Sequence, residues 1–205
     1  MIIETLFCDL HVHTIYSSDS LIQPKTLVDL LVRHSFIKVA AVTDHDSVRG
    51  CRATIELASA YPDILIIPGV EISTAQGDML VLGTEELPPR PWTPNEIVDY
   101  AKGIDGISII AHPYRLYGMG ELARNYDVDA IEVLNGGTSA QANEEAKELA
   151  KNLGLPGTAG SDAHQFSELF SVNCKVNASL NIDAVLKEIK KGSVTAQITR
   201  ESIHF

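Results

Sequence analysis

Short apolar runs alternate with amphipathic segments along most of this chain. The apolar runs are rich in valine, isoleucine and leucine and are typical of buried strands; we expect strands at 5–10, 37–43, 64–70, 78–83, 107–112, 129–134, 155–161, 170–176 and 193–198. The segments between them repeat apolar residues at helical spacing; we expect helices at 24–35, 47–61, 93–103, 139–154 and 181–192. This alternation predicts an α/β fold with a mostly parallel sheet, open or closed into a barrel.

The ends of the expected helices carry recognisable signals. Thr93 and Glu96 match a capping box, and Ser47 is a candidate N-cap for the second helix. Gly154 and Gly192 follow the last apolar position of their helices, where a glycine in the left-handed conformation commonly ends a helix. The proline-rich stretch 86–94 reads as a surface loop.

Length and composition favour one ordinary globular domain spanning residues 1–205. The chain is 45% hydrophobic and 21% charged, and no apolar stretch approaches the roughly 20 residues of a membrane helix. The N-terminal segment "MIIETLF" lacks the basic region of a signal peptide. The cysteines are three in number and widely spaced, which excludes a disulfide framework and a Cys-x-x-Cys zinc site. We therefore expect a cytoplasmic protein that does not bind a membrane.

Acidic and imidazole side chains cluster where the expected strands end. Five strands deliver such groups at their carboxyl ends: Asp9, His11 and His13; Asp44, His45 and Asp46; Glu71; His112, followed by Arg115; and Asp162 and His164. This edge of barrels and open α/β sheets is where functional sites are built. His34 and His204 lie elsewhere and are expected at the surface.

The two His-x-His-type pairs suggest a metal site. Residues i and i+2 of a strand point to the same face, so His11 and His13 can converge on one ion, and Asp162 and His164 repeat this spacing. A lone His-x-His is better explained by buried, hydrogen-bonded histidines, but six polar motifs at strand ends in one short chain favour a metal site. Imidazole and carboxylate ligands without thiolate suit zinc, manganese or iron.

The net charge of −11 narrows the classes of partner. An acidic surface repels nucleic acid and phosphorylated metabolites, so we expect no stable nucleic-acid binding. An anionic substrate would need a local positive centre, which bound metal ions can supply.

Six motifs in order along the chain resemble those of the PHP (polymerase and histidinol phosphatase) domain family. They read "DLHVHT", "TDHD", "PGVEIS", "AHPY", "DAIEVLN" and "GSDAH" and extend over nearly the whole sequence. The resemblance implies a distorted (β/α)7 barrel with two or three divalent metal ions at the C-terminal rim of its strands. It also implies a relation to the amidohydrolases and the hydrolysis of phosphoesters.

The resemblance further implies a set of metal ligands. His11, His13, Glu71 and Asp162 would hold one ion; Glu71 would bridge to a second ion that is also held by His112. A third ion would be held by Asp19, His45 and His164. Many family members have histidine or cysteine where Asn135 stands; an amide is a poorer ligand, so the second ion would be held more openly or more weakly. Asn135 is a candidate for substrate binding, with metal coordination as the alternative.

The remaining candidate residues surround these ligands. Arg115 is expected to clamp a phosphate, and Asp44 and Asp46 to orient imidazole N–H groups. Tyr114 is a candidate for packing against the substrate, with packing on the outside of the barrel as the alternative. Three ions against the carboxylates of Asp19, Glu71 and Asp162 would leave about +3 of charge in the pocket.

The function that these features favour is a phosphoesterase hydrolysing a phosphomonoester of a small metabolite through a metal-activated bridging water. The alternatives are a nuclease or nucleotide (bisphosphate) phosphatase, a histidinol phosphatase, and a non-catalytic metal-bound accessory module. Relatives that act on nucleoside bisphosphates carry an inserted segment between the Glu71 and His112 motifs, which this chain lacks. Histidinol phosphatases tend to be longer, and accessory modules usually lose several ligands.

Overall fold

A computed structural model describes residues 2–199 of the chain. Strands and helices alternate through most of it, in the order β1 (Glu4–Val12), α1 (Pro24–Arg33), β2 (Ile37–Val42), α2 (Arg49–Ala58), β3 (Leu65–Thr74), β4 (Gly77–Leu82), α3 (Pro94–Gly103), β5 (Ile107–Ile110), the 3₁₀ helix η1 (Gly120–Asn125), β6 (Ala130–Asn135), α4 (Ala140–Leu153), β7 (Gly157–Gly160), β8 (Val172–Ala178), α5 (Ile182–Lys190) and β9 (Val194–Ile198). Within the described residues, each helix is too short or too polar to cross a bilayer.

The strands form one nine-stranded sheet that curls into a barrel. Its order is β7-β6-β5-β4-β3-β2-β1-β8-β9. The pairs β1–β2, β2–β3, β5–β6 and β6–β7 are parallel, whereas β3–β4, β4–β5, β1–β8 and β8–β9 are antiparallel. The expected barrel class is confirmed, but the expectation of a mostly parallel sheet was wrong. A tight turn joins Thr74 to Gly77, and so short a link cannot provide the crossover that a parallel pair needs.

The sheet closes where the carboxyl ends of β1 and β7 meet. The amide of Asp162 donates to the carbonyl of His11 at 2.7 Å, and the amide of His13 donates to the carbonyl of Ala163 at 3.1 Å. Gly160 permits this approach, since a Cβ atom there would lie 2.2 Å from the Cβ of His11. Closure of the sheet therefore brings the first sequence motif, "DLHVHT", next to the last one, "GSDAH".

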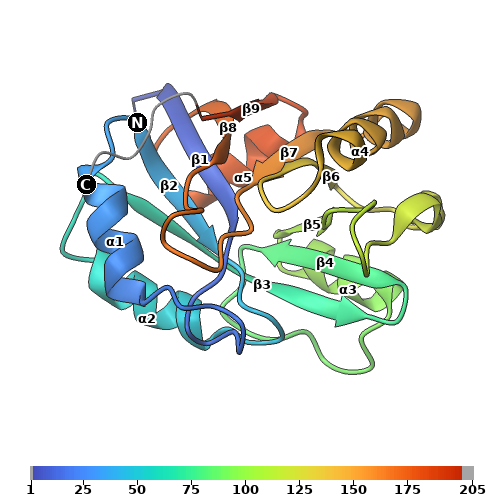
Figure 1. The fold of residues 1–205 in the computed structure, drawn as a ribbon, viewed down its shortest axis with the longest axis horizontal. Coiled ribbons are helices and arrows are strands. Elements are labelled where there is room, and N and C mark those ends of the chain that lie inside the picture. The colour runs from blue at the N-terminus through green and yellow to red at the C-terminus, as the bar shows by residue number, and fades with distance from the viewer. Residues whose placement is uncertain (1, 200–205) are drawn as a thin grey trace.

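Two apolar layers pack against the two faces of the sheet. Alternate residues of each strand face opposite sides: Val39 and Ala41 belong to an inner cluster and Ala40 and Val42 to an outer one. Helix α5 packs its apolar face into the inner cluster, while α1 to α4 cover the outside of the sheet (Figure 1). All three cysteines are buried in these layers and form no disulfide.

The helix ends mostly follow the signals in the sequence. Thr93 and Glu96 form the expected capping box of α3, and Gly154 and Gly192 adopt positive φ after α4 and α5. Ser47 is not the N-cap of α2: that helix begins at Arg49, and its capping residue is Val48, which offers no side-chain acceptor. The stretch 86–94 is a loop, as predicted, up to the first turn of α3.

Candidate metal centre

Four buried side chains converge at the rim formed by the carboxyl ends of the parallel strands, and we name them the inner site: His11, His13, Glu71 and Asp162. The Nε2 atoms of His11 and His13 lie 3.0 Å apart, and each lies 3.1–3.2 Å from Glu71 Oε2. Asp162 Oδ1 lies 3.1 Å from His13 Nε2. Ligands bound to one transition-metal ion at about 2.0–2.2 Å are about 3.0–3.5 Å from each other. The inner site therefore has the spacing of a single coordination sphere.

Hydrogen bonds on the far side of each ring fix which imidazole nitrogen faces the site. His11 Nδ1 lies 3.0 Å from Glu132 Oε1, and a carboxylate can only accept, so Nδ1 carries the proton. His13 Nδ1 lies 3.1 Å from Ser17 Oγ, whose own proton goes to Asp44 Oδ1 at 2.9 Å. In the neutral rings the lone pairs of both Nε2 atoms therefore point into the inner site, as metal ligands require.

Glu71 joins the inner site to a second group of ligands. Its other carboxylate oxygen, Oε1, lies 3.1 Å from His112 Nε2. Glu71, His112 and Asp78 bring one ligand atom each within 4.8 Å of one another. Sequence reasoning missed Asp78, the second residue of β4. Because β4 runs antiparallel, its amino end lies at the same rim as the carboxyl ends of the parallel strands.

A third group lies at the mouth of the barrel, and we name it the outer site: Asp19, His45 and His164. Asp19 Oδ2 lies 3.4 Å from His164 Nε2 and 3.6 Å from His45 Nε2. His164 Nδ1 donates to the carbonyl of Asp162 at 2.8 Å, which turns its Nε2 outward. The side chain of Asp19 is 55% exposed, whereas those of the inner site are at most 2% exposed.

The buried carboxylates and imidazoles strongly perturb each other's proton affinity. Burial alone would raise the pKa of Glu71, but the charge of His11 and hydrogen bonds from His11, His112 and His13 hold it well below its usual value. Burial would lower the pKa of His13, but hydrogen bonds to Asp162 and Glu71 outweigh it and raise that pKa to about 9. The metal-free site thus holds its carboxylates ionised and attracts positive charge.

Two buried nitrogens test whether this group fits a metal ion. His45 Nδ1 and His112 Nδ1 are buried and have no hydrogen-bond partner among the described residues. His45 Nδ1 lies 3.1 Å from Glu71 Oε2 without making a hydrogen bond. A buried imidazole nitrogen left unpaired carries a desolvation cost that a bound cation would offset. Together with the donor set, this fits two or three divalent ions.

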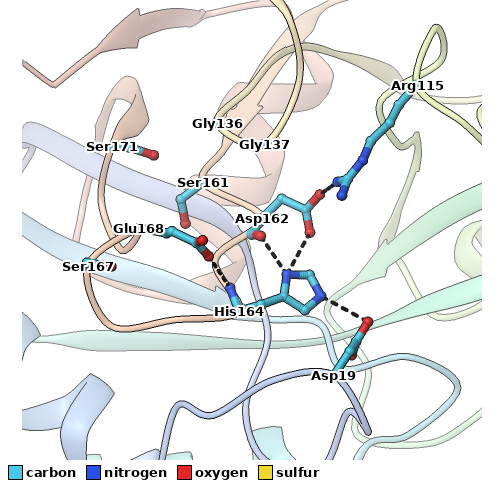
Figure 2. Close-up of a pocket in the computed structure, with 10 residues that line it drawn as sticks. All are labelled: Asp19, Arg115, Gly136, Gly137, Ser161, Asp162, His164, Ser167, Glu168 and Ser171. Carbon is cyan, nitrogen blue, oxygen red and sulfur yellow. Dashed lines mark hydrogen bonds and ion pairs between the residues drawn. The ribbon is translucent and has the colours of Figure 1, made fainter.

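A pocket of about 630 Å³ opens beside Asp162, Asp19 and His164 (Figure 2). Arg115 lines it and donates to Asp162 Oδ2. Asn135, assigned to substrate binding, is instead fully used within the protein. Its amide nitrogen donates to Glu132 and Asp162 at 3.0 and 3.2 Å, and its oxygen accepts from Gly137 and Thr138 at 2.9 Å each. Asn135 is therefore a positioning residue.

Glu132 is the second residue that sequence reasoning missed. It is buried in β6 and holds His11 Nδ1 through one oxygen and the amide of His112 through the other, at 3.0 and 2.9 Å. An acidic residue between Ile131 and Val133, inside a buried strand, is the signal that could have found it.

The structure gives Tyr114, Asp44 and Asp46 contacts that differ from those expected. Tyr114 lies outside the pocket: its hydroxyl donates to Glu121, and its ring packs on the outer apolar layer, which is the alternative stated above. Asp44 reaches the ring of His13 through the hydroxyl of Ser17, and Asp46 accepts from the amide of Ser73 at 3.0 Å. These two carboxylates hold loops of the rim.

His34 is not a bare surface residue. Its Nδ1 accepts hydrogen bonds from the amides of Phe36 and Ile37 at 3.3 and 3.0 Å, and its ring makes edge contacts with Phe36 and Phe170. It therefore shapes the turn between α1 and β2. His204 lies outside the described residues.

Comparison with known proteins places this geometry in a family. The PHP domain profile matches residues 9–127, and a second profile described as PHP-associated matches residues 140–194. The uncharacterized protein MJ1587 of Methanocaldococcus jannaschii is 30% identical over 139 residues, which are 62% of this chain and 80% of that protein. The uncharacterized protein MJ0417 of the same organism is 29% identical over 186 residues, which are 85% of this chain and 72% of that protein.

Solved structures share the fold at low identity. PsfC from Pseudomonas syringae PB-5123 superposes with a TM-score of 0.73 at 20% identity, covering 96% of this chain and 93% of that one. An amidohydrolase from Chromobacterium violaceum gives 0.67 at 18%, with 92% and 97% coverage. A protein proposed to be a metal-dependent phosphoesterase, from Bifidobacterium adolescentis, gives 0.61 at 17%, with 77% and 87% coverage. Since the PHP domain profile covers more than half of the sequence, the chain belongs to the PHP domain family.

Proposed function

We propose that this protein is a metal-dependent phosphoesterase that releases phosphate from a phosphomonoester of a small metabolite. The observation that carries the proposal is the overlap of three groups of possible ligand atoms at one end of the barrel. Glu71 belongs both to the inner site and to the group with Asp78 and His112, and His13 belongs both to the inner site and to a group with His45 and His164. Ligand groups that share a carboxylate favour ions close enough to act on one phosphate together. The protein from Bifidobacterium adolescentis, described as a metal-dependent phosphoesterase candidate, is consistent with this chemistry.

Bound divalent ions would lower the pKa of a water molecule and neutralise the charge of the phosphoryl group. The chain itself supplies the scaffold for them: Glu71 and Asp162 are ionised, and Glu132 and Ser17 hold the imidazoles in the required tautomer. Arg115 is the only Lys or Arg among the residues that line the pocket, and its side chain is 39% exposed. It is placed to bind the phosphate oxygens.

The positive charge of the pocket is smaller than the sequence led us to expect. Asp78 and Glu132 add two carboxylates to the three counted above, so three divalent ions would leave about +1 rather than about +3. The charge of Arg115 is then a substantial part of what attracts an anionic substrate. The full ligand set argues against a non-catalytic accessory module.

A phosphate-release screen tests the proposal. The purified chain would be stripped with a chelator, reloaded with manganese or zinc, and incubated with methyl phosphate, phenyl phosphate, sugar phosphates, nucleotides and histidinol phosphate. We expect metal-dependent release of phosphate from at least one monoester. Absence of release from every compound, with metal bound and the fold intact, would refute the proposal.

A further inference from the structure

The pocket extends beyond the metal ligands to a wall that has no part in holding ions. This wall, which we name the hydroxyl wall, consists of Gly136 and Gly137 after β6 and of Ser167, Glu168 and Ser171 between β7 and β8. It shares one cavity with Asp162 and Arg115 (Figure 2). A phosphate held at the ions and at Arg115 would therefore point its leaving group towards the hydroxyl wall.

The hydroxyl wall presents hydrogen-bonding groups that the protein does not use. Among the described residues, the hydroxyls of Ser167 and Ser171 have no hydrogen-bond partner. Glu168 accepts from the amides of His164 and Gln165 through Oε2, at 2.8 and 3.0 Å, which leaves Oε1 for another donor. Hydroxyls that both donate and accept, next to a carboxylate oxygen, complement the hydroxyl groups of a ligand.

The same lining offers nothing that would hold a flat or apolar group. Of the ten residues that line the pocket, only His164, an outer-site residue, has a ring, and none has an aliphatic side chain. Tyr114 packs elsewhere. Recognition of a nucleobase or a phenyl ring relies on stacking and apolar contact, which this wall cannot provide.

The charges of the pocket favour one phosphate and a neutral remainder. Arg115 is its only guanidinium or ammonium group, and it is already paired with Asp162. Glu168 and Asp19 place two further carboxylates in the lining. A second phosphate on the leaving group would face these carboxylates without a matching cation, which is unfavourable.

Two glycines keep the floor of this pocket open. A Cβ atom at Gly136 would lie 2.5 Å from Ser171 Oγ and would displace that hydroxyl. A Cβ atom at Gly137 would lie 3.3 Å from Arg115 Nη1 and 3.6 Å from Asp162 Oδ2, in the space between the guanidinium and the metal ligand. Backbone without side chains therefore leaves room for substrate where the phosphate and the leaving group would join.

From these observations we infer that the substrate is the monophosphate of a small neutral polyol, such as a sugar alcohol or sugar, whose hydroxyls bind Ser167, Glu168 and Ser171. The inference rests on the proposed function and adds the class of the leaving group. A cavity of about 630 Å³ has the size of small-metabolite sites.

The test compares kcat/KM of the manganese-loaded full chain for sorbitol 6-phosphate, glycerol 3-phosphate, fructose 1,6-bisphosphate, adenosine monophosphate and phenyl phosphate. We expect the best polyol monophosphate to exceed the bisphosphate and both aromatic esters by about tenfold or more. Equal or faster release from an aromatic ester or the bisphosphate would overturn the inference while leaving the phosphoesterase proposal in place. No release from any ester, methyl phosphate included, would overturn both.

Variants of the hydroxyl wall test whether its serines determine the preference for polyol esters. Ser171→Ala and Ser167→Ala should each lower the ratio of kcat/KM for the polyol ester to that for phenyl phosphate by roughly fivefold, with metal content and Tm retained. Ser193→Ala is the matched control, because Ser193 is exposed on the turn before β9, outside the pocket. An unchanged ratio in both wall variants would overturn the inference.

Discussion

The inner and outer sites use the same side-chain chemistry in opposite surroundings. In the inner site, all four residues are buried, and His11 and His13 are each held from behind by Glu132 or Ser17. In the outer site, Asp19, His45 and His164 are 55%, 33% and 20% exposed, and Asp19 lies 3.4–3.6 Å from its neighbours. Identical ligand types therefore occur once in a preorganised form and once in an open form.

This difference in exposure indicates how tightly each site would hold an ion and on which side substrate would enter. Ligands that neighbouring hydrogen bonds hold in place lose little conformational entropy when an ion binds. The attraction between these ligands and the ion is also stronger away from water. Exposed ligands on loops must be ordered by the ion itself. We expect tight binding at the inner site and exchangeable binding at the outer site, next to the pocket.

The largest effect should follow from removing the residue that all three ligand groups approach. Glu71→Gln keeps the size of the side chain but removes its charge and one acceptor, and we expect kcat/KM to fall by on the order of 1000-fold, with loss of bound metal. Phosphate release and elemental analysis measure this. Glu144→Gln, on the exposed face of α4, is the control; similar kinetics for the two variants would contradict the assignment of the inner site.

The next effect concerns Glu132, which touches the site only through its ligands. Glu132→Gln disturbs the carboxylate that holds His11 Nδ1 and the amide of His112, so we expect metal affinity to fall by about 10- to 100-fold. Competition with a metal-binding dye measures this affinity. Unchanged affinity would mean that the tautomer of His11 does not depend on Glu132.

The inner site should also respond to pH more strongly than the outer site. In the metal-free protein, burial is outweighed by Asp162 and Glu71, and the pKa of His13 rises to about 9, whereas burial lowers the pKa of His164. The raised pKa stabilises the metal-free fold fully below about pH 6.5, and this contribution is lost as pH rises through about 9. A metal ion must displace that proton, so the rise in Tm caused by metal should grow between pH 6.5 and 9. A rise that shrinks over this range would contradict the assignment.

The smallest effect on the site should come from a histidine outside both sites. His34→Ala removes the acceptor of two amide hydrogen bonds, so we expect the free energy of unfolding to fall by about 1–2 kcal/mol. Metal content and kcat/KM should stay as in the wild type. Chemical denaturation and elemental analysis check the two halves of this prediction, and metal loss in this variant would show that the site extends to α1.

The sequence predicted the residues that end strands better than it predicted the direction of those strands. His11, His13 and Asp162 could be placed together because i, i+2 spacing and the shared rim follow from elementary strand geometry. Asp78 could not, because an expected parallel β4 would carry its first residue to the opposite rim. Direction depends on tertiary pairing, which a short apolar run does not reveal.

Residues at the end of a strand or in the loop that follows it were the other source of error. Arg115 and Tyr114 are adjacent in the sequence, yet one lines the pocket and the other packs against the outer layer. Asn135 has the polarity of a substrate-binding residue, but its partners Glu132 and Asp162 occupy it. Which way a side chain leaves a loop depends on contacts between distant segments, so local pattern cannot predict it.

Stepwise removal of metal tests the central claim most directly. The metal-reloaded chain would be dialysed against increasing concentrations of a chelator, with bound metal and phosphate release measured at each step. The account predicts at least two tightly held transition-metal ions per chain, an exchangeable fraction lost first, and activity that disappears with the tight fraction and returns with manganese or zinc. Less than one equivalent of metal, with no gain in metal or activity on adding either ion, would contradict it.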